Sequence, residues 1–499
     1  MASEEVPSLS QDVIRGAKWY VMMRWSIRGL GFVSSAVLAR LLVPEDFGLV
    51  AMVLVIFGLV SLLFEFGVNW ALIQNNKATD DHFHTAWTVR VLQSCAVAGV
   101  LAACAPLIAS SYDDARLENI CWIMALGVFI RGFENIGVIK FQKDMKFAQD
   151  FAYSVAPKVI STFVTIGLAF YFRSYMALVM GTLLNSFTVV CASYIAIRFK
   201  PKFSFAKISE IWGFSQWVLV SNVAKYIGTR GDVMLLSLFS TPTNIGYYKW
   251  GTELSYMTMT EIQQPFSRAL MPGLAKIKDD HNRLIAAFLK ALSMMAVVAV
   301  PVALGFGAVS EELIPLFLGG GDKWLPVVPL VEALVFLSMS SALYGISGSL
   351  LLITGNVKYT AYISWVQAAV MLVSLYPAYY FAGMEGVAYS RGGLGIVMFF
   401  VVSLLATNRC NFRLQSILSV VWRPVAAGIG MFVLLTSLSD VWVLDIWMLL
   451  GVKIVIGVIF YVVALLLLWG LAGRPDTAEH QILGYIRTKL KKSSKTYKA

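Results

Sequence analysis

Fourteen apolar runs, each long enough to cross a lipid bilayer, constrain this chain more than any other feature of its sequence. A membrane-spanning helix needs about 20 mainly apolar residues, and 58% of the 499 residues are hydrophobic while only 14% are charged. The sequence therefore predicts an all-α polytopic membrane protein. The runs fall at about 15–38, 46–70, 85–109, 117–139, 149–171, 174–197, 209–236, 245–271, 284–308, 326–352, 358–381, 384–406, 419–439 and 446–471.

Basic residues lie mainly on one side of these predicted helices. If the N-terminus is cytoplasmic, 24 of the 40 Lys and Arg residues fall in inner segments and 4 fall in outer loops. Cytoplasmic loops of membrane proteins carry such an excess. We therefore expect a multi-pass protein with both termini in the cytoplasm. The net charge of +11 then reflects topology and requires no nucleic-acid surface.

Three residues near the start of the chain recur 198 positions later, which indicates an internal repeat. Each copy opens a block of six helices, and an even number of helices gives both copies the same orientation in the membrane. The repeated pairs are Trp19 and Trp217, Pro44 and Pro242, and Gly48 and Gly246. We predict two six-helix lobes, a C-terminal hairpin and a cytoplasmic amphipathic, basic tail, at 1–205, 206–415, 416–471 and 472–499.

Charged residues inside the first six runs share one predicted depth, in the cytoplasmic half of the first lobe. Five are cations and two are carboxylates, and burying the surplus cations unpaired would cost several kcal/mol per ion. Because the guanidinium fork suits phosphate, we expect the cations to line a cavity for an anionic substrate and the carboxylates to orient them. Alternatively, Arg24 and Arg28 extend to the near interface or pair structurally with Glu65. The residues are Arg24, Arg28, Arg90, Arg131, Lys158, Glu65 and Glu134.

The second lobe carries a different pattern of charge. Glu253 and Glu261 belong to a polar stripe at helical spacing, which forms either structural pairs or a site for a coupling proton or sodium ion. Arg391 falls in the outer half of its helix and precedes a cluster of glycines. It is either a substrate contact or part of a helix-packing site.

Several classes of function lack their sequence signals. No phosphate-binding G-x-x-x-x-G-K-[ST] motif is present, and no catalytic or zinc-ligating arrangement occurs at a consistent depth, so we expect neither an enzyme nor a metal site or other cofactor. Four of the five cysteines fall inside predicted helices and none forms a C-x-x-C pair. Disulfides are not expected.

Several short motifs resemble the polysaccharide transporter family of the multidrug, oligosaccharidyl-lipid and polysaccharide flippase superfamily. They include Gly16-Ala17-Lys18-Trp19, Val37-Leu38-Ala39-Arg40, Phe64-Glu65-Phe66-Gly67, Pro272-Gly273-Leu274-Ala275-Lys276-Ile277 and Lys323-Trp324. The chain is most similar to exporters of exopolysaccharide repeat units of the colanic-acid or xanthan type.

The resemblance implies two lobes of helices around a cleft in the bacterial inner membrane. It also implies alternating-access translocation of undecaprenyl-diphosphate-linked oligosaccharides for exopolysaccharide or O-antigen synthesis, and a polysaccharide polymerase and export machinery as partners. The alternative is a cation-coupled multidrug exporter of the same fold. Such an exporter should favour carboxylates in its cleft, whereas the first lobe has an excess of cations.

Overall fold

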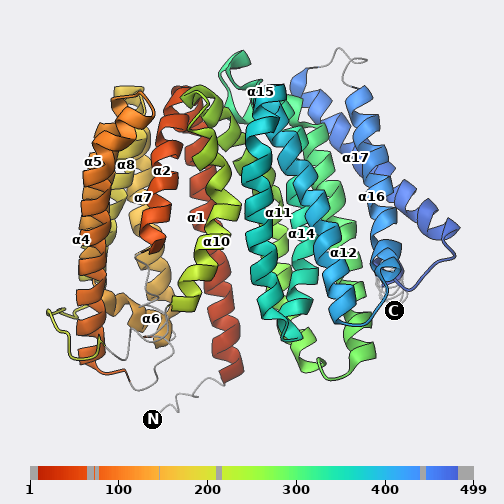
Figure 1. Ribbon diagram of the computed structural model, residues 1–499, viewed down its shortest axis with the longest axis horizontal. Coiled ribbons are helices and arrows are strands. Elements are labelled where there is room, and N and C mark those ends of the chain that lie inside the picture. The colour runs from red at the N-terminus through yellow and green to blue at the C-terminus, as the bar shows by residue number, and fades with distance from the viewer. Residues whose placement is uncertain are drawn as a thin grey trace, which may run out of the picture. The chain divides into compact units, whose positions relative to one another are not determined.

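A computed structural model describes residues 9–63, 72, 78–144, 146–208, 216–438 and 445–481. These residues form helices and no strands, which confirms the predicted all-α class (Figure 1). Two compact units can be distinguished, Met1–Gly246 with Leu318–Gly320 and Tyr247–Phe317 with Gly321–Ala499. The predicted lobe limits at residues 205 and 415 stay a prediction.

The first unit is a bundle of long helices. Helix α4 packs on α5, α5 on α8, α7 on α8, α1 on α7, and α2 on α10. These contacts place α2, α4, α5 and α8 around a common interior. The helices are α1 (Leu9–Leu41), α2 (Pro44–Leu63), α4 (Asp80–Ser111), α5 (Arg116–Gly132), α6 (Ile139–Lys143), α7 (Phe147–Phe172), α8 (Met176–Ala196) and α10 (Gln216–Leu236), with a 3-10 turn at Ile136–Val138.

The second unit is also helical. Helix α14 packs on α15 and α12, and α12 packs on α16, which contacts α17. Helix α11 starts in the first unit and continues into the second beyond Gly246. The helices are α11 (Pro242–Lys276), α12 (His281–Ala308), α13 (Ser310–Leu318), α14 (Val327–Ile353), α15 (Val357–Arg409), α16 (Leu414–Ser437) and α17 (Ile446–Leu471), with a 3-10 turn at Gly321–Trp324.

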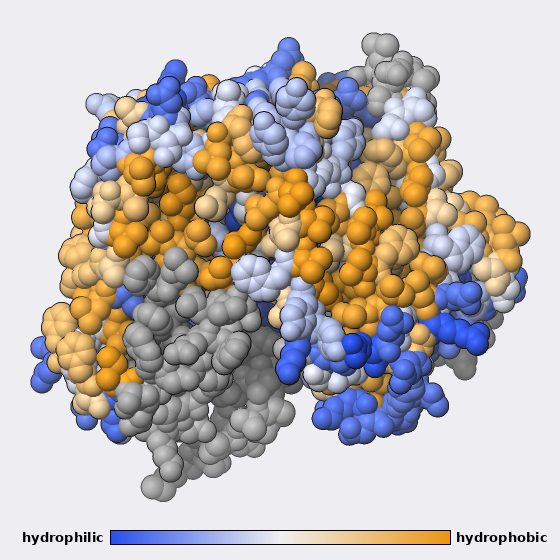
Figure 2. All heavy atoms as spheres, viewed as in Figure 1, coloured by the Kyte–Doolittle hydropathy of each residue, from blue (hydrophilic) through white to orange (hydrophobic). Residues whose placement is uncertain are grey.

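Apolar side chains cover much of the helical surface. In the space-filling view, hydrophobic residues gather over the middle of the helices of each unit and hydrophilic residues over their ends (Figure 2). Phe163 is 67% exposed and Ile195 is 85% exposed, as lipid-facing side chains would be. Within the described ranges, nine helices are long and apolar enough to cross a membrane, or up to ten with a bent pair. The count of fourteen spans stays a prediction.

Two breaks interrupt runs of helix. Helices α5 and α6 are separated by a short break and bent by 62°. In α15, Ala382 and Gly383 leave the helical conformation, and Gly383 has a φ of +58°. This second break falls at the very short turn expected between the runs 358–381 and 384–406, so α15 comprises two helices.

The repeated prolines and glycines meet in space. Pro44 opens α2 and Pro242 opens α11. A Cβ built on Gly48 would lie 1.7 Å from the carbonyl oxygen of Pro242, and one built on Gly246 would lie 1.9 Å from that of Pro44. Only glycine permits such a close backbone approach. The first turn of α2 and the first turn of α11 therefore pack against each other, and each glycine faces the proline carbonyl of the other helix.

Candidate functional site: a cationic cavity in the first unit

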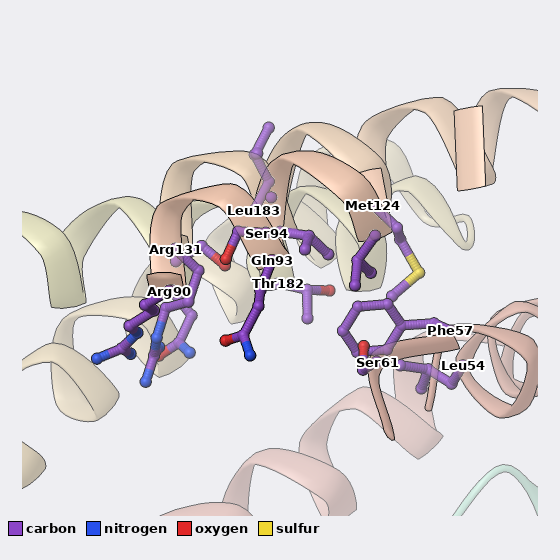
Figure 3. A pocket seen from close by; sticks show the side chains of 15 residues that line it. Leu54, Phe57, Ser61, Arg90, Gln93, Ser94, Met124, Arg131, Thr182 and Leu183 are labelled. Atoms are coloured by element: carbon purple, nitrogen blue, oxygen red, sulfur yellow. The ribbon is translucent and has the colours of Figure 1, made fainter. Parts of the chain in front are cut away.

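A cavity of about 500 Å³ opens among helices α2, α4, α5 and α8 of the first unit. Its two ends differ in chemistry. Figure 3 shows Arg90 and Arg131 side by side at one end, with Leu54, Phe57 and Met124 gathered at the other. The cavity is therefore amphipathic along its length. Polar residues also line the cavity, namely Ser61, Gln93, Ser94, Thr182, Asn185 and Ser186.

One buried carboxylate organises the cationic end. Glu134 accepts hydrogen bonds from the guanidinium groups of Arg90 and Arg131, the latter at 2.9 Å, and from the hydroxyl of Tyr153. Its side chain is 7% exposed, against 21% for Arg90 and 42% for Arg131. The carboxylate thus holds two cations while leaving both accessible from the cavity.

The local sequence explains how these groups meet. Gly132 follows Arg131, and a Cβ on it would lie 2.4 Å from the Cβ of Ser94, so glycine lets α5 end directly against α4. Asn135 then fixes the bend, because its backbone N–H donates to the Ser193 hydroxyl at 2.9 Å. Its side-chain amide donates to the Phe199 carbonyl at 2.6 Å. Glu134 therefore lies between Gly132, where α5 packs against α4, and the hydrogen-bonded Asn135.

The cationic end carries a surplus charge. Two guanidinium groups share one carboxylate, which leaves a formal charge of +1 on the cluster. Each guanidinium has five N–H donors, and within the described part of the chain neither makes a side-chain hydrogen bond other than those to Glu134. Donors therefore remain for an anion.

Gln93 adds a further donor beside the arginines. It lies three residues after Arg90, so one helical face presents both side chains, and Figure 3 shows it next to the two guanidinium groups. Its amide nitrogen is buried and has no hydrogen-bond partner within the described residues. A buried donor without a partner is costly, and a ligand acceptor in the cavity would remove that cost.

Comparison with known proteins identifies the family. Residues 37–329 match the family model described as polysaccharide biosynthesis protein. The chain belongs to this family. Relatives include the lipopolysaccharide biosynthesis protein WzxC of Escherichia coli, 25% identical over 70% of this chain and 72% of WzxC. The predicted membership of a polysaccharide transporter family is confirmed.

The fold of this polysaccharide biosynthesis protein is that of a known flippase. The lipid II flippase MurJ, in an inward closed conformation, superposes with a TM-score of 0.73 at 15% identity, over 90% of this chain and 98% of MurJ. An inward-facing MATE family multidrug resistance transporter gives 0.62 at 11% identity, over 77% of this chain and 94% of the transporter. Both comparisons show a similarity of fold.

Three of the predicted site residues of this polysaccharide biosynthesis protein come together at the cavity. Arg90, Arg131 and Glu134 form its cationic end. Lys158 lies half-buried on α7 and forms no ion pair with any described residue. Glu65 lies outside the described residues.

The other predicted residues lie elsewhere. Arg24 is half-buried and Arg28 exposed on α1, which packs on α7, and neither lines this cavity. In the second unit, Glu253 is exposed and Glu261 half-buried on α11. Arg391 is 2% exposed on α15. Their assignment as site residues stays a prediction.

Two contributors escaped the sequence analysis. Gln93 could have been recognised from its spacing, since a residue three positions from Arg90 shares its helical face. Tyr153 gave no such signal. A tyrosine in an apolar run is ordinary, and only the packing of α7 brings its hydroxyl to Glu134.

Proposed function

We propose that this protein is a flippase that moves undecaprenyl-diphosphate-linked oligosaccharides from the inner to the outer leaflet of the bacterial inner membrane. The carrying observation is the cavity of the first unit, whose cationic end is held ready by the buried Glu134. Both termini are cytoplasmic in this proposal, which places Arg90 and Arg131 in the inner half of the bundle.

The chemistry of the cavity matches a lipid-linked diphosphate. Arginine donates two parallel hydrogen bonds to a phosphate, and the Gln93 amide supplies a further donor. Beyond them, Thr182, Asn185 and Ser186 offer the hydroxyl and amide groups that sugars require. Phe57 and Met124 extend an apolar wall. The family supports this assignment, since it is a family of polysaccharide biosynthesis proteins.

A cation-coupled multidrug exporter of the same fold is the second candidate. The fold is compatible with it, because a MATE family transporter superposes over much of the chain. The charge of the cavity is not compatible with it, since a surplus positive charge at the binding end repels cationic drugs.

Energy coupling is a separate part of the proposal, with Glu253 and Glu261 as the candidates to bind a proton or sodium ion. A polysaccharide polymerase and export machinery are the proposed partners.

A transport assay with Arg131→Gln tests the proposal. The purified protein is reconstituted into proteoliposomes that contain a fluorescent lipid-diphosphate oligosaccharide. Translocation is measured as the change in the fraction of fluorescence that an external quencher removes. Loss of one charged hydrogen-bonding group is worth about 1.5–3 kcal/mol. We therefore expect transport to fall roughly tenfold to a hundredfold at limiting substrate.

Arg283→Gln is the matched control, because Arg283 is 73% exposed on α12 of the second unit. It should transport as the unmodified protein does. Unchanged transport by Arg131→Gln, or extrusion of cationic drugs by the unmodified protein without lipid transport, would contradict the flippase assignment.

A further inference from the structure

A second, smaller pocket lies apart from the cationic cavity. It has a volume of about 190 Å³ and is formed where α1 meets the start of α7 and the short helix α6. Three of its six lining residues are aromatic, and one is a carboxylate. The residues are Trp19, Tyr20, Met23, Gln142, Phe147 and Asp150.

Among the described residues, no cationic side chain pairs with the carboxylate of this pocket. Asp150 is half-buried and forms no ion pair with any described residue. Its hydrogen-bond partner is the side-chain amide of Gln142, which carries no charge. The neighbouring Lys146 pairs instead with Asp144, at 3.2 Å between its Nζ and a carboxylate oxygen. A half-buried carboxylate with a neutral partner is most stable when a cation joins it.

The aromatic side chains favour the same ligand. The faces of Trp, Tyr and Phe rings attract ammonium groups, and aromatic cages recognise them in other proteins. Here Trp19 and Tyr20 come from α1 and Phe147 comes from α7, so two helices contribute rings to one small space. Trp19 is further braced against Phe151, at 5.3 Å between ring centroids. An ammonium group satisfies both the rings and the carboxylate.

The position of the pocket indicates where such a cation comes from. Trp19 and Phe147 lie near the predicted cytoplasmic ends of α1 and α7, and Trp and Tyr are enriched at the level of lipid head groups. Lys18 and Lys146 precede these two aromatic residues in the chain and are exposed. In the predicted topology they lie near the cytoplasmic ends of α1 and α7, close to the lipid phosphates. We propose that this pocket binds the ammonium head group of phosphatidylethanolamine from the inner leaflet.

Native mass spectrometry of the full-length protein in detergent tests this site. Phosphatidylethanolamine and phosphatidylglycerol with identical acyl chains are titrated separately, and bound lipid is counted by mass. We expect the unmodified protein to prefer phosphatidylethanolamine. Because a hydrogen bond to a charged group contributes about 1.5–3 kcal/mol, Asp150→Asn should weaken that binding about tenfold or more. Asp279→Asn is the control, since Asp279 is exposed and outside the pocket.

Two outcomes of the titration would overturn the site. One is equal binding of the two lipids by the unmodified protein, and the other is undiminished phosphatidylethanolamine binding by Asp150→Asn. A shift of the melting temperature by free ethanolamine alone, without any effect of the intact lipid, would also overturn the lipid as its source.

Crosslinking covers the case in which Asp150→Asn does not fold. The unmodified protein is irradiated with phosphatidylethanolamine that carries a photoreactive head group, and the adducts are mapped by peptide sequencing. Adducts within 19–23 or 142–150 support the site, whereas adducts confined to other segments would contradict it. Neither experiment measures transport, so the lipid site stands or falls separately from the flippase assignment.

Discussion

Glu134 has the least freedom of any group at the cationic end of the cavity. Both of its carboxylate oxygens are used, one by the two arginines and the other by Tyr153. Three of the roughly four acceptor sites of the carboxylate are thus occupied by protein donors. Its role is therefore to position the two guanidinium groups, whose remaining donors are left for substrate.

Replacing Glu134 by Gln should move the guanidinium groups of Arg90 and Arg131 apart. The substitution removes the negative charge between two cations, which then repel each other, and it leaves one carbonyl oxygen to accept in place of two. Breaking a buried ion pair costs about 3–5 kcal/mol, and the partial exposure of Arg90 and Arg131 reduces this to roughly 1–3 kcal/mol. We expect a lower melting temperature and at least tenfold weaker substrate binding.

Tyr153→Phe and Glu118→Gln serve as comparisons for that variant. Tyr153→Phe removes one hydroxyl and keeps the charges, so its cost should be near 1 kcal/mol. Glu118 lies in the first turn of α5, outside the cavity. Its substitution should leave binding unchanged. Equal substrate binding by Glu134→Gln and Glu118→Gln, measured by fluorescence titration of the purified proteins, would show that the arginines need no such support.

At the scale of the helices, α2 and α11 approach each other closely. Each begins with a proline, and each places a glycine one turn later against the other's first carbonyl. A hydrogen atom fills the space where a methyl group would collide with backbone. Since backbone cannot move aside as a side chain can, these two turns require glycine more strictly than a side-chain contact would.

Gly48→Ala should force the two turns apart. Overpacking typically costs about 1–3 kcal/mol, and a clash with backbone belongs at the upper end of that range. We expect a clear drop in the melting temperature of the purified protein. Gly29→Ala on α1 is the control, because a Cβ there meets nothing within 4 Å. Since alanine is the better helix former by about 1 kcal/mol, that control should be neutral or slightly stabilising. Equal melting temperatures for the two variants would exclude a tight crossing.

The sequence predicted the helices better than the contacts between them. Apolar runs have to become helices in lipid, and each predicted run overlaps a helix within the described residues. The bend at Asn135 was not predicted, because it depends on Ser193 and Phe199 far along the chain. Arg423 was counted as an inner-segment charge, yet it is fully buried in α16 beside Glu479 at 3.5 Å.

The candidate site was predicted only in part, for a related physical reason. Depth in the membrane follows from the predicted topology, and three of the residues that it grouped, Arg90, Arg131 and Glu134, form ion pairs with one another. Depth does not determine the side of a helix. Arg24 and Arg28 share the predicted depth but are not among the residues that line this cavity, and their role stays a prediction. Rotation about the helix axis is determined by packing, which single-sequence charge patterns do not encode.

At the scale of the whole molecule, one orientation connects the charge pattern to the proposed transport. In the predicted orientation, with both termini in the cytoplasm, the cationic end of the cavity lies within reach of a diphosphate on the cytoplasmic side. An inverted protein would present the same arginines to the outer side, where a lipid-linked substrate is released. The direction of transport therefore depends on the predicted topology, which labelling can test.

Single cysteines introduced into a variant without the five native cysteines should report that topology. Ser110 and Asp322 lie in predicted outer turns of the first and second units, Asp144 and Asp279 lie in predicted inner ones, and all four are exposed. In intact cells, a membrane-impermeant maleimide should label positions 110 and 322 and leave 144 and 279 unlabelled until the membrane is opened. The opposite labelling pattern would show that the protein is inserted in the membrane with the inverse orientation. A mixed pattern within one unit would mean that a helix between the two positions does not cross, because each crossing exchanges the sides.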